Sequence, residues 1–296
     1  MRSQNLEMVR ALVIVEGADL EPRFFARVAE SYGMRLQIVS LKTNIYRLYS
    51  KLKEYGFDYS VRVALRELLG EDIPALEEDF AYTYLVFDCD AQNRGRVRQG
   101  ERTPALSEIV EANAMRLDEM IGYFNDETDP DRGRLYVNYP MMESYRDCDF
   151  PFDDAYAATE VTFDELVGYK ARVGRRKFAS RRIDTLMRSD FDLMMRQQLF
   201  KLSVLNGDGW QAPSYEAYGR MSRQSNVLAR QRLLFSSCRM SVMNTSLFLP
   251  IDYFGDERSY RQIADTERYP LFDLPFPGTS VIADNGEMCC APNSGR

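Results

Sequence analysis

The chain has 296 residues, of which 45% are hydrophobic and 28% are charged, with a formal net charge of −7 and no histidine. The lack of histidine excludes Ser-His-Asp and Cys-His catalysis and imidazole metal sites, so any chemistry must come from carboxylates, Lys, Tyr, Ser or a metal ion. No apolar run approaches the ~20 residues of a transmembrane helix, and we expect a cytoplasmic protein with no membrane contact.

The first half of the chain alternates strand and helix signals. Short runs of apolar, β-branched and aromatic residues predict buried strands, and amphipathic stretches between them predict helices, the first with Pro22 in its first turn and Gly33 at its end. Asn113 is the one polar residue in the apolar stripe of the last of these helices. The pattern favours an α/β fold with a doubly wound, mostly parallel sheet. The predicted strands are 11–15, 36–41, 84–87 and 135–137, and the helices are 22–33, 44–55, 61–69 and 104–124.

The second half shows few strand signals. Helices are predicted over 163–172, 183–204 and 215–234, and the chain beyond Pro250 is expected to be loop-like. We therefore expect an α/β domain over 1–150, a mainly helical domain over 151–270 and a loop-like tail over 271–296. A Met-rich stripe in this half is expected to be core packing, and with Trp210 it also offers apolar surface for an oligomer contact. The stripe consists of Met187, Phe191, Met194 and Met195.

Acidic residues follow two of the predicted strands directly. Glu16 comes after the first strand, and Asp88 and Asp90 come after the third. Ligands of parallel sheets bind beyond the carboxyl ends of the strands, so these carboxylates can meet at one edge. Carboxylate oxygens suit hard divalent cations, and the sequence therefore indicates a metal site.

The spacing around these acids resembles the Toprim fold of type II topoisomerases, bacterial-type primases and several nucleases. The carrying motifs are Glu16-Gly17-x-x-x-Glu21-Pro22-x-Phe24-Phe25 and Asp88-x-Asp90, and the resemblance covers residues 8–145. The first motif is most similar to compact Toprim nucleases of phage defence, such as RloB-like and OLD-family proteins and AriB of the PARIS system. Residues 138–143, Asn-Tyr-Pro-Met-Met-Glu, resemble the Asn-Pro-x-Phe-Glu-x-Trp segment of RloB-like proteins, with one residue inserted, Met142 in place of the Phe and Tyr145 in place of the Trp.

The resemblance implies catalytic metal ligands at Glu16, Asp88 and Asp90, with Glu21 and Glu143 as ligands of a second ion. The implied cofactor is Mg²⁺, with Mn²⁺ as the alternative. From the residues alone, Glu21 is equally an acid that favours the dipole of the following helix, and Glu143 a surface acid. Gln92 stands where topoisomerases commonly carry a third acid, which weakens a topoisomerase interpretation.

Positive charge is gathered in two places. The predicted nucleic-acid contacts are Arg94, Arg96, Arg98, Arg175, Arg176 and Lys177. Further basic residues flank them at Arg102, Lys170, Arg172, Arg181 and Arg182. A basic loop directly after metal ligands is well placed to hold a phosphate backbone. A solvated face or a contact with an acidic protein are the alternatives.

The family resemblance implies a metal-dependent Toprim endonuclease that acts as the toxic effector of an antiphage system. It implies tRNA or another RNA as the substrate of the AriB branch and DNA as that of the OLD branch. A separate ABC-type ATPase would restrain it, because the chain has no phosphate-binding P-loop motif, and we expect a homodimer in the active state. The alternatives are a non-catalytic docking or regulatory subunit on a degenerate Toprim scaffold, and a phosphotransfer enzyme or phosphatase.

Overall fold

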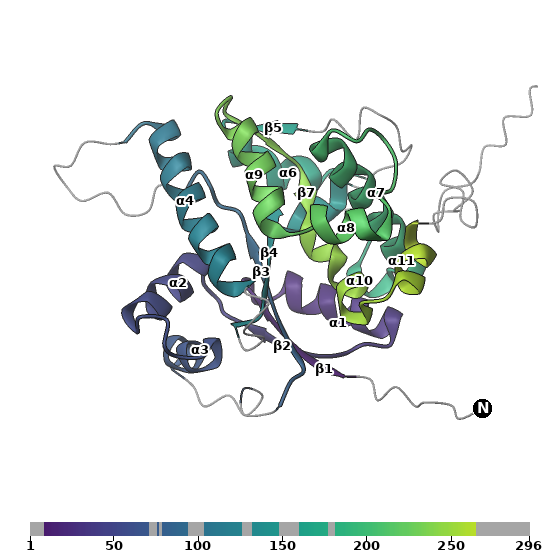
Figure 1. Ribbon diagram of the computed structural model, residues 1–296, viewed down its shortest axis with the longest axis horizontal. Coiled ribbons are helices and arrows are strands. Elements are labelled where there is room, and N and C mark those ends of the chain that lie inside the picture. The colour runs from purple at the N-terminus through teal and green to yellow at the C-terminus, as the bar shows by residue number, and fades with distance from the viewer. Residues whose placement is uncertain are drawn as a thin grey trace, which may run out of the picture. The chain divides into compact units, whose positions relative to one another are not determined.

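The computed structural model describes residues 9–70, 76, 79–93, 104–125, 132–147, 160–176 and 181–264. A five-stranded sheet with the order β2-β1-β3-β4-β7 runs through them (Figure 1). The first four strands in sequence are parallel, and β7 pairs antiparallel with β4. This confirms the α/β class and the mostly parallel sheet. The strands are β1 (Arg10–Val15), β2 (Arg35–Ser40), β3 (Tyr82–Asp88), β4 (Arg134–Tyr139) and β7 (Met243–Asn244).

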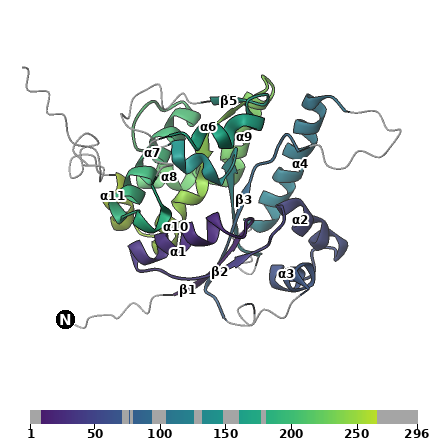
Figure 2. The same cartoon turned by 180° about the vertical axis from the view of Figure 1, so that it is seen from behind.

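Helices cover both faces of this sheet, so its central strands are buried on both sides. Residues 11–15 of β1 are fully buried, as a continuous apolar run requires in a parallel sheet. α1 lies on one side of the sheet, and α2, α3 and α4 lie on the other (Figures 1 and 2). All four helices match the predicted ones closely. Their bounds are α1 (Leu20–Tyr32), α2 (Ile45–Glu54), α3 (Val61–Leu69) and α4 (Leu106–Phe124).

The second half is helical, as predicted, but its helices are shorter and more numerous. The helix predicted over 183–204 is confirmed from Arg188 on, after a short 3₁₀ segment, Ile183–Thr185. The one predicted over 215–234 was wrong as a single helix, because two helices, Tyr215–Met221 and Gln224–Phe235, take its place. The prediction of a loop beyond Pro250 was also wrong. Pro250 stands in the first turn of a helix, where its missing N–H removes no hydrogen bond. The helices are α6 (Leu166–Val173), α7 (Arg188–Asn206), α8 (Tyr215–Met221), α9 (Gln224–Phe235), α10 (Leu249–Phe254) and α11 (Glu257–Ala264).

Short strands were missed in this half. β5 (Glu160–Thr162) and β6 (Arg239–Ser241) pair in a separate two-stranded sheet, and β7 has only two residues. Strands of two or three residues are too short to show a period of two, and only their pairing partners define them.

Residues of the second half provide hydrogen-bond partners for the backbone of β4, which would otherwise be an edge strand. Gln224 accepts a hydrogen bond from Val137 N at 3.1 Å, and Thr245 donates one to Val137 O at 2.8 Å. These side chains, together with β7, satisfy backbone groups that an edge strand would leave open. The described residues accordingly lie in one compact unit. The expected boundary near residue 150 and the tail over 271–296 lie outside the described residues, so the division into domains stays a prediction.

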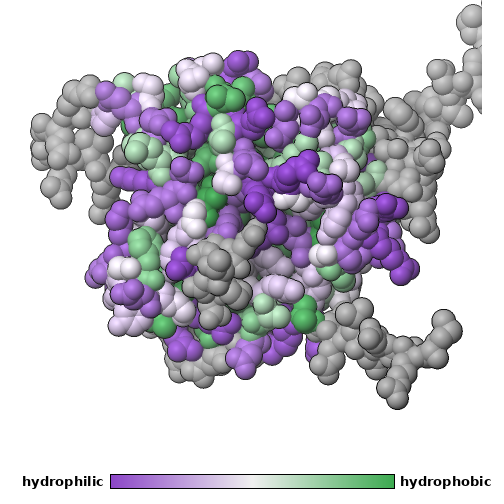
Figure 3. All heavy atoms as spheres, in the orientation of Figure 1, coloured by the Kyte–Doolittle hydropathy of each residue, from purple (hydrophilic) through white to green (hydrophobic). Residues whose placement is uncertain are grey.

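The Met-rich stripe lies mainly in the core. Phe191, Met194 and Met195 are at most 1% exposed, whereas Met187 is 44% exposed. The stripe therefore does not provide the expected surface for an oligomer contact. On the face shown in Figure 3, hydrophilic side chains dominate and hydrophobic ones form small groups.

The entry into β4 depends on a glycine. Gly133 has φ of 82°, and a Cβ there would stand 2.8 Å from the Thr83 carbonyl oxygen of the neighbouring strand. Gly133→Ala should lower the free energy of unfolding by about 2 kcal/mol, because it adds both backbone strain and a clash. Urea unfolding measures this change. Gly168→Ala is the control, since its Cβ would meet no atom within 4 Å, and equal stability of the two variants would contradict the argument.

Candidate metal and nucleic-acid site

All five acids predicted from the sequence lie at the carboxyl edge of the sheet. Glu16 directly follows β1, Asp88 is the last residue of β3, and Asp90 comes two residues later. Glu143 comes from the 3₁₀ segment Met142–Asp147 after β4, and Glu21 stands in the first turn of α1. Parallel strands carry their carboxyl ends to one edge, which is why residues so far apart in sequence meet. We call these five residues the acidic cluster.

The negative charges of the cluster act on one another. Burial, followed by the charge of Asp90, raises the pKa of Glu16 to about 7. Burial and then the charge of Glu16 hold the pKa of Asp88 well above its ordinary value. Burial also raises the pKa of Glu21 and of Asp90. Partial removal from water and like charges nearby both disfavour ionisation, so the site carries fewer negative charges at neutral pH than its composition suggests.

Backbone N–H groups hold three of the carboxylates. Glu16 accepts a hydrogen bond from Asp88 N at 3.3 Å, Asp88 from Met142 N at 2.7 Å, and Glu21 from Gly17 N at 3.2 Å. The Glu21 carboxylate lies directly over Gly17, where a Cβ would collide with it. These bonds fix the direction of each carboxylate before any ligand arrives.

The loop after β3 is fixed by side chains of other elements. Asn113 of α4 donates to the carbonyl oxygens of Ala91 and Asn93, both at 2.9 Å. Asp90 adopts a left-handed backbone conformation with φ of 44°, which is uncommon for a residue other than glycine. The polar residue in the apolar stripe of α4 thus supports the site, a role that its spacing could not reveal.

A lysine enters the acidic cluster from the second half of the chain. The Lys170 ammonium forms an ion pair with the Glu143 carboxylate, which is 6% exposed. This bond is the main cause of the raised pKa of Lys170, and the charges of Glu21 and Asp88 add to it. The sequence analysis placed Lys170 in a basic stretch, and only the fold brings it to the acids.

The donor chemistry of the cluster suits Mg²⁺, because it consists of carboxylate oxygens. In the conformation shown, however, no group of three acidic or cysteine side chains within the described ranges is arranged to hold a metal ion. Glu21 is turned toward Gly17 N and Glu143 toward Lys170. Coordination would require side-chain rotations that release some of these bonds.

Acids from other parts of the chain neutralise much of the predicted basic stretch. Arg176 pairs with Asp147, which is 1% exposed, at 3.2 Å, and Arg181 pairs with Asp190. Arg175 is exposed and forms no ion pair with another described residue. Of the predicted contacts, Arg94, Arg96, Arg98 and Lys177 lie outside the described residues.

Comparisons with protein-family models, curated proteins and solved structures return no match for this chain. The resemblance to Toprim proteins therefore stays a prediction. Among the described residues, no helix combines the length and the apolar character needed to cross a bilayer.

The raised pKa of Glu16 predicts a loss of stability as pH rises. Between its ordinary value of 4.5 and the folded value of about 7, the folded state binds more protons than the unfolded state. The free energy of unfolding should therefore fall over this range, with Glu16 contributing up to about 3 kcal/mol. Glu16→Gln should flatten the fall and be more stable than the wild type at pH 8. Urea unfolding from pH 5 to 8 measures both slopes, and identical slopes would contradict the assignment.

Proposed function

We propose that the protein is a metal-dependent endonuclease that hydrolyses phosphodiester bonds of nucleic acid at the acidic cluster. The observation that carries this proposal is the gathering of five partly buried carboxylates at the carboxyl edge of a parallel sheet. Such a concentration of like charge is costly for folding, and perturbed titration in a cluster of this kind is typical of functional sites. A divalent cation would offset the repulsion among these carboxylates.

The residues of the cluster would have separate roles. When bound, Mg²⁺ or Mn²⁺ supplies an activated water and neutralises charge on the phosphate. Glu16, with a pKa of about 7, can take up or release a proton near neutral pH. Lys170 carries a side chain that is 70% exposed beside the buried Glu143, and it can offer positive charge to a substrate phosphate.

The substrate and partners in this proposal follow from the family resemblance. We propose RNA, and tRNA foremost, as the substrate, with DNA as the alternative. We further propose that the enzyme acts as a toxic antiphage effector, is restrained by a separate ABC-type ATPase, and is active as a homodimer. Cleavage assays on tRNA, unstructured RNA and DNA side by side separate the substrates.

A docking or regulatory subunit is the second candidate. The ion pair between Lys170 and Glu143 favours it, because an internal cation then neutralises the site without a metal. In that case, the carboxylates serve the packing of the loops after β1, β3 and β4. The two candidates differ in their response to divalent cations.

The endonuclease proposal predicts binding of a divalent cation. Mg²⁺ at about 100 times its dissociation constant should stabilise the wild type by about 2.7 kcal/mol. It should also support cleavage that EDTA stops. Asp88→Asn should remove the stabilisation and lower cleavage by more than about 100-fold. Losing a residue that only supports a metal ligand typically costs about 10- to 100-fold, and a ligand itself should matter more. Thermal unfolding with and without Mg²⁺, and a gel-based cleavage assay, measure these effects.

Asp118→Asn is the matched control, because Asp118 is an exposed acid of α4 outside the cluster. It should bind Mg²⁺ and cleave like the wild type. Cleavage that persists in EDTA, or that survives in Asp88→Asn, would refute the metal-dependent mechanism. The absence of both stabilisation by Mg²⁺ and cleavage of any nucleic acid would favour the docking subunit.

Two neighbouring arginines should behave differently. Arg175→Ala should weaken binding of nucleic acid and reduce the slope of log affinity against log salt by about 0.7 to 0.9, with little effect on stability. Arg176→Ala should lower the free energy of unfolding by about 1–3 kcal/mol, because it removes a partner of the buried Asp147. Fluorescence anisotropy in a salt series and urea unfolding measure the two quantities. An unchanged salt slope for Arg175→Ala would assign Arg175 to a solvated face.

A further inference from the structure

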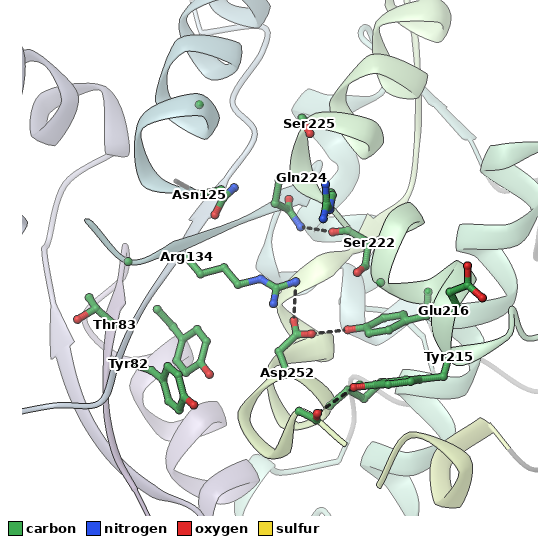
Figure 4. Close-up of a pocket in the computed structure, with 18 residues that line it drawn as sticks. Tyr82, Thr83, Asn125, Arg134, Tyr215, Glu216, Ser222, Gln224, Ser225 and Asp252 are labelled. Atoms are coloured by element: carbon green, nitrogen blue, oxygen red, sulfur yellow. Dashed lines mark hydrogen bonds and ion pairs between the residues drawn. The ribbon is translucent and has the colours of Figure 1, made fainter. Parts of the chain in front are cut away.

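A cavity of about 1060 Å³ opens at the sheet edge opposite the acidic cluster. It lies where β3 and β4 begin, and its other walls come from the end of α4, from α8, from the start of α9 and from α10 (Figure 4). The acidic cluster lies at the other ends of the same strands, so the two features are separate. The volume is at the upper end of the range for small-molecule sites.

Two of the charged groups that line this cavity neutralise each other, and a third, Glu216, pairs with Arg220 outside the lining. Arg134 pairs with Asp252 at 3.1 Å, and the Asp252 carboxylate also accepts hydrogen bonds from Tyr136 at 2.5 Å and Tyr218 at 2.8 Å. Figure 4 shows Arg134 extended toward Asp252 across the cavity. Because the Asp252 carboxylate already has three partners, the charged pair provides a polar but nearly neutral surface. Such a surface suits an uncharged polar molecule better than a strong anion.

An aromatic ladder runs along one wall, and its members Tyr82 and Tyr84 line the cavity. The rings of Tyr82 and Tyr84 have centroids 6.1 Å apart, and those of Tyr84 and Tyr136 are 6.0 Å apart. Tyr82, at the outer end, is 46% exposed, whereas Tyr84 is 3% exposed. An exposed ring at the end of such a ladder offers its face to a planar ligand.

Two glycines keep the opposite walls open. Gly122 lies in α4 and Gly219 in α8, and a Cβ at either position would meet no atom within 4 Å. Glycine within a helix is less stable than alanine, so both positions lose helix stability without any steric need. Larger side chains there would extend into the cavity.

One side chain of the lining has unused hydrogen-bond donors. Asn125 accepts a hydrogen bond from Leu135 N at 2.8 Å through its Oδ1. Its Nδ2 is buried and has no hydrogen-bond partner among the described residues. A buried amide N–H₂ without a partner is costly, and an acceptor atom on a ligand would satisfy it once the side chain turns toward the cavity.

We propose that this cavity binds a nucleoside, free or as the nucleoside part of a nucleotide. A nucleobase matches the three observations together: it is planar and stacks on an exposed tyrosine, it carries hydrogen-bond acceptors at its edge, and its uncharged ring suits the neutralised pair. The ribose, which is polar and uncharged, fits the remaining volume between Gly122 and Gly219. This site does not depend on the proposed nuclease activity.

The test is isothermal titration calorimetry with the four ribonucleosides and their 5′-monophosphates. It is carried out in EDTA, so that no divalent cation can bring phosphate to the acidic cluster. At least one nucleoside should bind saturably with one site per chain. Tyr82→Ala should weaken its affinity about five- to hundred-fold, because base stacking is lost.

Filling the cavity gives the sharper result. Gly219→Leu and Gly122→Leu should each weaken binding at least about tenfold while leaving the thermal unfolding midpoint unchanged or raised, since leucine favours a helix over glycine. Gly168→Leu in α6 is the control, because this glycine also has open space around it but does not line the cavity. It should bind like the wild type. Lack of binding by every nucleoside and nucleotide at millimolar concentration, or undiminished binding by both filled variants, would overturn the proposal.

Discussion

The confinement of like charges at the carboxyl edge of the sheet is the constraint on which the site depends. Glu16, Asp88 and Asp90 stand close together in partly dry surroundings, where burial and neighbouring charges disfavour the ionisation of Glu16 and Asp88, and burial that of Asp90. The chain meets this cost in three ways: protonation, hydrogen bonds from backbone N–H groups, and the ammonium of Lys170. Each of them can be reversed by a cation that binds the carboxylates more strongly.

The helical second half is part of the architecture of this edge. Asn244 of β7 donates to the Met142 carbonyl oxygen at 2.8 Å, and Asn138 of β4 accepts from Ser246 N at 3.1 Å. Met142 in turn supplies the N–H that holds Asp88. Buried amide networks that are fully hydrogen-bonded specify one arrangement, because any other leaves polar groups unpaired. The orientation of Asp88 thus depends on residues more than a hundred positions later in the chain.

The two ends of the sheet have different character. At the carboxyl ends, charges of one sign gather, and Lys170 opposes them. At the amino ends, the charges of Arg134 and Asp252 compensate each other, and the hydroxyls of Tyr136 and Tyr218 donate hydrogen bonds to Asp252. The strands separate these environments, so a ligand at one end does not compete directly with a ligand at the other. Coupling between them would have to pass along β3 and β4, whose first and last residues line the cavity and flank the cluster.

The sequence by itself determined the first four strands, the helices between them and the acids at the strand ends. Its local patterns sufficed there, because a buried parallel strand is an apolar run and its carboxyl end has a fixed place in the sheet. It did not determine the partners of Lys170 and Arg176. Their partners, Glu143 and Asp147, lie far from them in sequence, and only folding brings the side chains together. Nor did the sequence reveal the role of Asn113 or the pair of Arg134 and Asp252. Tertiary structure decided these contacts, since hydrogen bonds and ion pairs between distant segments depend on topology and leave no periodic signal in the chain.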